Sequence, residues 1–328
     1  MSKIFLQALI AVLVLINFSA TSAMPVWTLP SEGVKLDGVA KQRYVKSKMD
    51  VIFHKKQGEE NPFAKFETPD GWNYEKFNIE GVKVELLENP KSTTDRVVLQ
   101  LHGGGYVLPL DNGYRNLGMI QGVLADAAQI YCVDYRTAPE NVYPSALEDA
   151  VKIYGEILSR GVDPAKIIVT GDSAGGNLAL ELSLYLKENN TPQPKCLILI
   201  SPWTTMTTNM PSRKYNDKRD LILGKGTPLN EEVGKPVYAN GLKLKDSRLS
   251  PIYADLKGLP PMLIQVGGYE LFLDECIELA KKAMADNVKV TLTIYPEMSH
   301  DFALLLPQLQ ESVDSFGEIR DFINLNVD

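Results

Sequence analysis

Short apolar runs alternate with longer amphipathic stretches along most of this chain. The apolar runs are rich in β-branched residues and predict strands at Val82–Leu87, Arg96–Leu101, Gln129–Val133, Lys166–Thr170, Cys196–Ile200, Met262–Val266 and Val288–Tyr295. The amphipathic stretches predict helices at Tyr143–Ser159, Ala174–Lys187, Leu271–Ala285 and Gln308–Leu325. Strands that alternate with helices of this length favour an α/β fold, in which a mostly parallel sheet carries helices on both faces.

Two regions interrupt this alternation. Residues 24–80 hold Pro, Gly, Trp and mixed charges with little sustained periodicity, and they predict an N-terminal extension that docks on another part of the chain. Between Ile200 and Met262 there is no strong strand signal, and a structureless loop of that length inside a compact domain is unusual. We therefore expect an insertion with its own helices at about 203–255, in a main domain that spans 81–328, and we expect both regions to form a lid.

The N-terminus has the pattern of a secretory signal peptide. Lys3 precedes an apolar run from Ile4 to Ile16, and small and polar residues follow up to Ala23. We expect cleavage after Ala23, which places the mature protein in the periplasm or outside the cell, without stable membrane association. An uncleaved membrane anchor is the alternative. Removal of residues 1–23 takes away Lys3 and no acidic residue, so the formal net charge changes from −7 to −8.

Charge and cysteine content exclude several classes of function. A net charge of −7 argues against nucleic acid as a partner, because phosphate binding requires a clustered basic surface. The three cysteines, Cys132, Cys196 and Cys276, form no C-x-x-C pair and are expected to be buried free thiols. With only three histidines in the sequence, we expect no metal site, and no motif predicts an organic cofactor.

The strongest local signal is the segment Gly171-Asp172-Ser173-Ala174-Gly175-Gly176. It follows a predicted strand and opens a predicted helix, which is the context of a G-x-S-x-G nucleophile elbow. The flanking glycines tolerate a tight turn, the serine projects from the end of the strand, and the helix N-terminus favours negative charge there. The pattern predicts Ser173 as a nucleophile. The alternative is a Gly-rich turn that presents no reactive group.

A second glycine-rich segment, His102-Gly103-Gly104-Gly105, follows the strand that ends at Leu101. Acyl transfer develops negative charge on an oxygen, and backbone amides must approach that oxygen closely. We expect amides of Gly103, Gly104 and Gly105, with Gly104 foremost, to act beside the amide of Ala174. His102 is expected to hold this loop in shape by hydrogen bonding. Phosphate binding is disfavoured because the Gly-Lys-Ser/Thr ending of a P-loop is absent.

The chain resembles the hormone-sensitive-lipase-like family of α/β-hydrolases, whose bacterial members are carboxylesterases. The motifs that carry the resemblance are HGGG at 102–105, DYRTAPE at 134–140, GDSAGGN at 171–177 and SPW at 201–203. The resemblance covers about 82–325. It implies the α/β-hydrolase fold, and a lid made from the N-terminal region and the insertion that precedes the acid-bearing strand.

His300 is the candidate general base. It follows the predicted strand that ends at Tyr295, so it belongs to the same edge of the sheet as Ser173. A serine hydroxyl needs a base to take its proton, and an imidazole can return that proton to the leaving alcohol. His54 precedes the sheet, and His102 begins the glycine loop. The family usually has a glycine after this histidine where this chain has Asp301, a departure that bears on loop shape and local charge.

The third member of the triad is an acid between serine and histidine in the chain. By register with the family pattern, Glu270 falls where the acid usually sits, although aspartate is commoner there. Asp274 is the alternative, but it is expected one turn into the following helix, where an acid already has a structural explanation. Asp172, next to the nucleophile, is expected to point away from Ser173 and to make structural hydrogen bonds.

Four further residues have expected roles near the site. Tyr135, Arg136 and Glu140 are expected to lock the loop that follows their strand. Tyr106, next to the oxyanion glycines, either lines the acyl or alcohol pocket or is an exposed loop aromatic.

Together these features predict a serine carboxylesterase that acts on short acyl groups, acetyl among them, carried by small alcohols or sugars. Two alternatives stay open: an amidase or peptidase of the same fold, and a non-catalytic ligand-binding protein. Association through the final strand would give a homodimer.

Overall fold

The structure is a computed structural model, and it describes residues 31–53 and 65–328. The predicted signal segment 1–23 and His54 lie outside the described residues. The strands form one sheet in the order β1-β2-β4-β3-β5-β6-β7-β8. They are β1 Asn73–Ile79, β2 Val82–Glu88, β3 Val97–Leu101, β4 Gln129–Asp134, β5 Ile167–Asp172, β6 Cys196–Ile200, β7 Met262–Gly267 and β8 Val290–Tyr295. β2 is antiparallel to both neighbours and every other pair is parallel, which confirms the predicted mostly parallel sheet.

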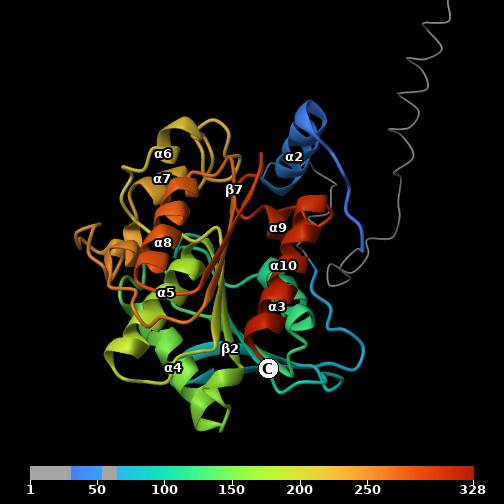
Figure 1. The fold of residues 1–328 in the computed structure, drawn as a ribbon, viewed down its shortest axis with the longest axis vertical. Helices are drawn as coiled ribbons and strands as arrows, with labels where there is room; N and C mark the ends of the chain where they lie inside the picture. The colour runs from blue at the N-terminus through green and yellow to red at the C-terminus, as the bar shows by residue number, and fades with distance from the viewer. Residues whose placement is uncertain (1–30, 54–64) are drawn as a thin grey trace, which may run out of the picture.

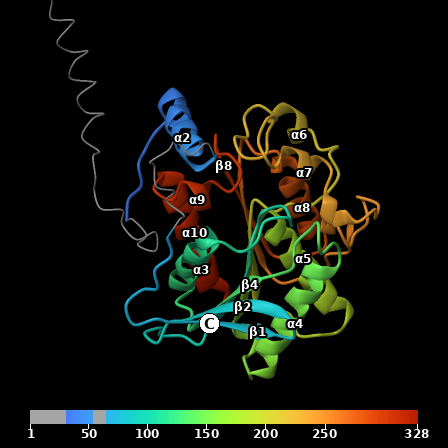
Figure 2. The same cartoon turned by 180° about the vertical axis from the view of Figure 1, so that it is seen from behind.

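Helices cover both faces of this sheet, as the sequence predicts. The helices are α2 Gly38–Phe53, α3 Asn112–Ala125, α4 Ser145–Ser159, α5 Ser173–Glu188, α6 Ser212–Tyr215, α7 Asn230–Gly234, α8 Leu273–Ala285, α9 Phe302–Leu305 and α10 Gln310–Asn326. Figures 1 and 2 show α3 and α10 on one face and α4, α5 and α8 on the other. Every residue of β3, β5 and β6 is buried, because a parallel sheet between two helical layers has no solvent-facing side.

The sheet begins earlier than the sequence predicts. β1 lies within the segment 24–80 that was expected to be an extension, and it pairs along its whole length with β2. Its sequence, NYEKFNI, alternates between exposed and half-buried positions without an apolar run. A half-exposed edge strand has few apolar residues that would predict it, and β1 is instead held in place by its pairing with β2.

Helix α3 is a second element that the sequence pattern did not single out. It contains three glycines, which lower helix propensity. Its packing on β4 explains two of them, because a Cβ at Gly118 would lie 2.8 Å from the Cys132 sulfur and one at Gly122 would lie 2.6 Å from Ile130. The close approach of helix and strand therefore requires the residues that weaken the local helix signal.

The two irregular regions meet the rest of the chain at the same end of the molecule, where α2, α6 and α7 lie above the sheet in both views (Figures 1 and 2). Val34 pairs with residues around Leu309, and Lys41 forms an ion pair of 2.5 Å with Glu311 at the start of α10. The insertion has only short helices. In residues 31–53 and 65–328, none of the helices is long and apolar enough to cross a membrane.

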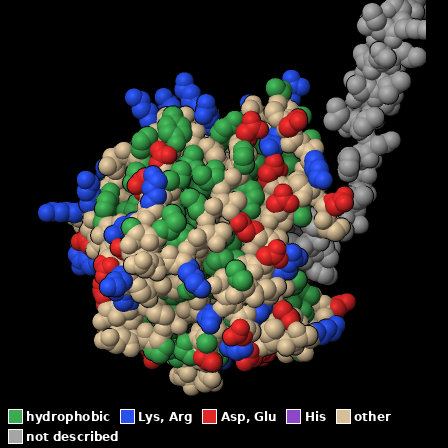
Figure 3. Space-filling model, viewed as in Figure 1, with side chains coloured by type: hydrophobic (Ala, Val, Ile, Leu, Met, Phe, Trp, Pro, Cys, Tyr) green, Lys and Arg blue, Asp and Glu red, His purple; other side chains and the backbone are tan. Residues whose placement is uncertain are grey.

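The surface is mixed in charge. Over the face in Figure 3 acidic and basic side chains are interspersed, apart from a group of Lys and Arg at the top, above α6. Cys132, Cys196 and Cys276 are buried and free, which confirms the expectation for all three.

Candidate active site

Ser173 is the first residue of α5, directly after β5. Its backbone φ of +51° places it in the left-handed region, the strained turn expected of a nucleophile elbow. A Cβ at Gly175 would lie 2.0 Å from the carbonyl oxygen of Leu101, so only glycine fits there. The Trp203 amide donates to the Ser173 carbonyl at 2.9 Å, which ties the elbow to the segment after β6.

The loop after β3 lies against the elbow. Gly104 has a φ of +99°, which is accessible to glycine with little strain. Within the part of the chain that the structure describes, the amides of Gly103, Gly104, Gly105 and Ala174 donate no hydrogen bond. Amides that have no acceptor and lie at a turn or at a helix N-terminus are suited to donate hydrogen bonds to a negatively charged oxygen.

His102 holds this loop, as the sequence predicts. Its Nδ1 donates to the Gly103 carbonyl at 2.8 Å, and its ring stacks on Tyr135 with centroids 4.1 Å apart. The Tyr135 hydroxyl donates to the His102 carbonyl at 2.6 Å. Complete burial lowers the pKa of His102 to about 4. The ring is therefore neutral at physiological pH.

The expectations for the neighbouring residues divide. Arg136 forms the predicted lock, with its Nε 3.0 Å from an oxygen of the buried Asp149. Glu140 does not, because it is exposed and makes no hydrogen bond among the described residues.

Neither prediction for Tyr106 is correct. Its side chain is fully buried, its hydroxyl donates to Asn177 at 2.7 Å, and its ring stacks on Tyr238 with centroids 4.0 Å apart. Asn177 also donates to the Trp203 carbonyl at 2.6 Å. Tyr106 therefore packs the glycine loop 102–105 onto α5 and is not exposed to a ligand.

The structure brings His300 and Glu270 together. Nδ1 of His300 lies 3.1 Å from Oε2 of Glu270, and both side chains are buried. Asp274, the alternative acid, accepts hydrogen bonds from the Ser212 amide at 2.7 Å and the Tyr215 hydroxyl at 2.9 Å instead. Asp274 therefore fastens the insertion to α8, and Glu270 is the carboxylate that orients the imidazole.

Glu270 is held by more than the histidine. Its Oε1 accepts a hydrogen bond from the Ser201 hydroxyl at 2.7 Å and another from the Gly267 amide. Burial raises the pKa of Glu270 to about 7, while the hydrogen bond and charge of His300 oppose that rise. Three donors around one buried carboxyl fix its direction.

Several residues that position the acid were not found from the sequence. Asn216 of the insertion donates to the Glu270 carbonyl at 2.8 Å, and Asp220 accepts from the Leu271 amide at 2.9 Å. Ser201, which follows β6, belongs to the SPW motif, but nothing local indicated its contact with Glu270. These contacts join segments that are more than fifty residues apart, so no local signal could have found them.

Asp301 also lies at the site. Its Oδ2 is 3.0 Å from Nε2 of His300, the ring nitrogen opposite the one that faces Glu270. Burial alone would lower the pKa of His300, but the carboxylates of Asp301 and Glu270 outweigh it and raise that pKa well above the ordinary value. The imidazole is thus held between two acids.

Asp172 is buried, as expected for a structural acid next to the nucleophile. Its Oδ2 accepts a hydrogen bond from the Tyr114 hydroxyl at 3.1 Å. Burial raises the pKa of Asp172 well above its ordinary value, and the nearby charge of Asp301 raises it further.

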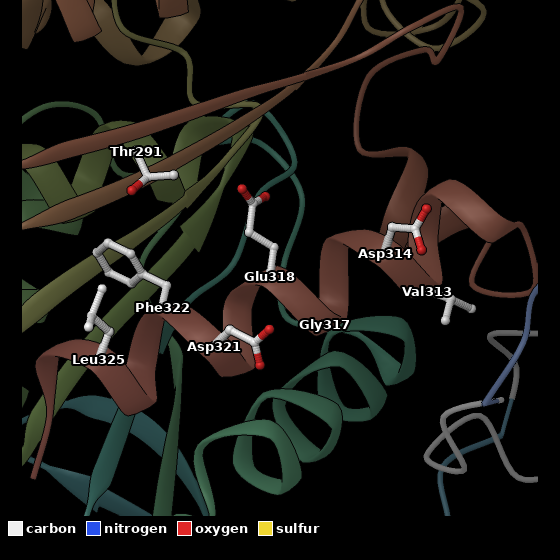
Figure 4. A pocket seen from close by; sticks show the side chains of 8 residues that line it. All are labelled: Thr291, Val313, Asp314, Gly317, Glu318, Asp321, Phe322 and Leu325. Atoms are coloured by element: carbon white, nitrogen blue, oxygen red, sulfur yellow. The ribbon is translucent and has the colours of Figure 1, made fainter.

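A hollow of about 520 Å³ lies elsewhere, between β8 and α10 (Figure 4). Glu318 points into it, but its carboxylate already accepts hydrogen bonds from Gln265 at 2.6 Å and the Tyr295 hydroxyl at 3.0 Å. Neither Ser173 nor His300 lines this hollow. Within the described residues, no group of three or more His, Cys, Asp or Glu side chains is arranged to hold a metal ion.

The chain is similar to proteins that are named as esterases. A family model described as the α/β hydrolase fold matches residues 98–304. An esterase of Acinetobacter venetianus is 34% identical over 244 residues, which cover 74% of this chain and 79% of the relative. An acetyl-hydrolase of Streptomyces hygroscopicus is 34% identical over 222 residues, 68% of this chain and 73% of that one.

Solved structures that are similar to this chain are also esterases. An esterase from the bacterial hormone-sensitive lipase family superposes with a TM-score of 0.79 at 29% identity, covering 89% of this chain and all of the other. EstE5, soaked with p-nitrophenyl butyrate, superposes with a TM-score of 0.75 at 33% identity, covering 86% of this chain and 97% of that one. The chain therefore belongs to the α/β-hydrolase fold family, among the bacterial esterases of the hormone-sensitive lipase type.

Proposed function

We propose that this enzyme is a serine carboxylesterase that hydrolyses short-chain acyl esters, acetyl esters among them, through an acyl-Ser173 intermediate. The observation that carries the proposal is the arrangement of three parts at one edge of the sheet. These are a serine at a left-handed elbow, a buried His300–Glu270 contact of 3.1 Å, and a glycine loop whose amides donate no hydrogen bond to any described residue.

The chemistry follows from these parts. His300 Nε2 takes the proton of the Ser173 hydroxyl while its oxygen attacks the ester carbonyl carbon. The carbonyl oxygen becomes negatively charged and is received by the amides of Gly104 and Ala174, together with those of Gly103 or Gly105. The intermediate collapses, and His300 gives the proton to the leaving alcohol. Water then repeats the sequence on the acyl-serine and releases the carboxylic acid.

Glu270 keeps the imidazole in the tautomer that carries its proton on Nδ1 and stabilises the imidazolium that forms, without itself being protonated in the cycle. The proposed acyl range is supported by relatives whose names include acetyl-hydrolase, and by a neighbour that was soaked with a butyrate ester. The alcohol moiety is proposed to be a small alcohol or an acylated sugar.

The test is hydrolysis of p-nitrophenyl acetate, butyrate and decanoate by the purified mature enzyme and by its Ser173→Ala variant. We expect acetate or butyrate to be cleaved fastest and the variant to lose the activity. Ser183→Ala is a matched control, because Ser183 is a buried serine further along α5. A preference for decanoate would overturn the short-chain proposal but keep the mechanism. Full activity in Ser173→Ala would overturn the mechanism.

If the folded protein hydrolyses none of the three esters, that result would favour an amidase or a binding protein of the same fold. Amide substrates of the same acyl groups, tested beside the esters, separate these two outcomes. A binding protein would leave both substrates intact.

We further propose that the chain is exported, with cleavage after Ala23, and that the free edge strand β8 is available for pairing with a second copy. The mass of the protein recovered from periplasm or medium tests the first point. Sedimentation of the purified enzyme tests the second.

A further inference from the structure

Asp301 is a buried acid in direct contact with the proposed base. Its side chain is 9% exposed, and its Oδ2 lies 3.0 Å from Nε2 of His300. The second oxygen, Oδ1, is buried without a hydrogen-bond partner among the described residues. A carboxylate in such a place is costly unless an opposite charge offsets the loss of solvation, and a protonated imidazole supplies that charge.

A structural explanation for this carboxylate fails on the contacts. Asp301 precedes α9, but its side chain makes no capping hydrogen bond to that helix. Its backbone has a φ of +50°, where glycine would be less strained. Its amide donates to the Ser201 hydroxyl at 3.2 Å, and any residue except proline could make that bond. Among the described residues, His300 is the only polar partner of the Asp301 carboxylate.

Nε2 is the nitrogen that has to take the proton from the Ser173 hydroxyl in the proposed mechanism. No hydrogen bond between Ser173 and His300 is formed in this structure, although both residues are described. Nδ1 is engaged by Glu270 on the other side of the ring. When both nitrogens face carboxylates, both can be donors only if the ring is the imidazolium.

We propose that Asp301 is a positioning residue whose carboxylate holds His300 in its protonated form through Nε2, so that this contact must open before the imidazole can act on Ser173. The proposal rests on the proposed serine mechanism. When the contact opens, the proton on Nε2 passes to solvent, and the lone pair left on Nε2 is then free to accept the proton of the serine hydroxyl. The contact between Asp301 and His300 therefore makes the enzyme less active at acidic pH than an enzyme with glycine at position 301.

Other ionisable groups surround this pair and share the same field. Asp172, at the end of β5, interacts with both His300 and Asp301, and burial favours its neutral form. The charge of Asp220, from the insertion, raises the pKa of Glu270. The Tyr114 hydroxyl, from α3, donates to Asp172 and stays neutral because burial raises its pKa well above the ordinary value. The ring of Phe272 covers another side of His300, with its centroid 4.9 Å away. Asp301 is the one of these that touches Nε2.

The test is the pH dependence of kcat/KM for p-nitrophenyl acetate in the wild type and Asp301→Asn, followed by pH-stat titration. The acid limb reports the pKa of the base in the free enzyme. Removal of a negative charge that favours the imidazolium lowers this pKa, so we expect the limb to move to lower pH by about one unit or more. Asparagine keeps the size of the side chain and tolerates the left-handed backbone.

Glu297→Gln is the matched control, because it removes one carboxylate from the same loop, where Glu297 lies 3.8 Å from Lys41. Its acid limb should stay with the wild type. If Asp301→Asn has the wild-type limb, or if both variants move equally, the proposal is wrong. Asp301→Gly serves the same purpose should Asp301→Asn not fold, since glycine is unstrained at this φ.

A second readout does not depend on turnover. With only His54, His102 and His300 in the chain, nitrogen NMR of histidine-labelled enzyme can follow the His300 ring directly. In the Ser173→Ala background, the His300 ring should titrate at lower pH when Asp301→Asn is added than when Asp301 is present. Equal titration would overturn the role of Asp301 even if Ser173 proves to be the nucleophile. Conversely, an active Ser173→Ala enzyme would overturn the mechanism and leave the His300 contact to be decided by NMR.

Discussion

The loops that follow β3 and β8 each place a buried histidine at the same edge of the sheet, yet the two rings have different partners and opposite pKa shifts. His102 stacks on Tyr135 and donates to the carbonyl of Gly103. His300 lies between the carboxylates of Glu270 and Asp301. Burial lowers the pKa of His102 to about 4, whereas the two acids raise that of His300 well above its ordinary value.

The comparison separates two roles that sequence alone assigns to the same residue type. Without a carboxylate in contact, burial keeps a histidine neutral at physiological pH, and its ring supports the backbone. With carboxylates in contact, an equally buried histidine keeps a proton that it can release and take back. The partners, more than the degree of burial, determine which histidine can act as a base.

The largest effect is expected where the comparison is broken at Glu270. Glu270→Gln removes the carboxylate from Nδ1 of His300, so the imidazole loses both its tautomer and the partner of its positive charge. We expect kcat for p-nitrophenyl acetate to fall by about 10⁴-fold, as for the equivalent change in a serine triad. Asp274→Asn is the matched control. If it costs as much as Glu270→Gln, the assignment of the acid is wrong.

A smaller effect, on stability, comes from the neutral histidine. The unfolded chain binds a proton at His102 near its ordinary pKa of 6.5, whereas the folded chain does so only near 4. Stability contributed by neutral His102 is therefore present above pH 6.5 and is lost as pH falls towards 4. Between pH 7 and pH 5 the loss should be about 2 kcal/mol in the free energy of unfolding.

Urea unfolding at both pH values, in the wild type and in His102→Asn, measures this contribution. The change between pH 7 and pH 5 should be smaller in the variant by that amount, because other titrating groups are common to both proteins. An equal change in the two proteins would mean that His102 is not held neutral by the fold.

The smallest effect tests the hydrogen bond that supports His102. Tyr135→Phe keeps the stacked ring and removes the hydroxyl that donates to the His102 carbonyl. We expect a loss of about 1 kcal/mol in the free energy of unfolding. Tyr131→Phe is the control, since its hydroxyl makes a longer bond of 3.3 Å to Gln129. A loss no larger than that of the control would argue against the support.

Much of the site was predictable because its signals are local. The elbow around Ser173 and the glycines at 103–105 are consecutive residues that follow strong strand signals, and a strand end fixes their position. The sheet was largely predictable for the same reason, from apolar runs that are buried on both faces. β1 and α3 escaped, because one has a polar edge sequence and the other needs glycines for close packing.

The sequence by itself therefore determined the strand pattern, the candidate nucleophile, the glycine loop and the order of serine, acid and base along the chain. Only the tertiary structure decided that Glu270 faces His300 while Asp274 holds the insertion, that Tyr106 is packed inward, and that Asp301 meets Nε2. The reason is physical. Backbone pattern is set by neighbouring residues, but burial and charge at a side chain depend on segments that only folding brings together.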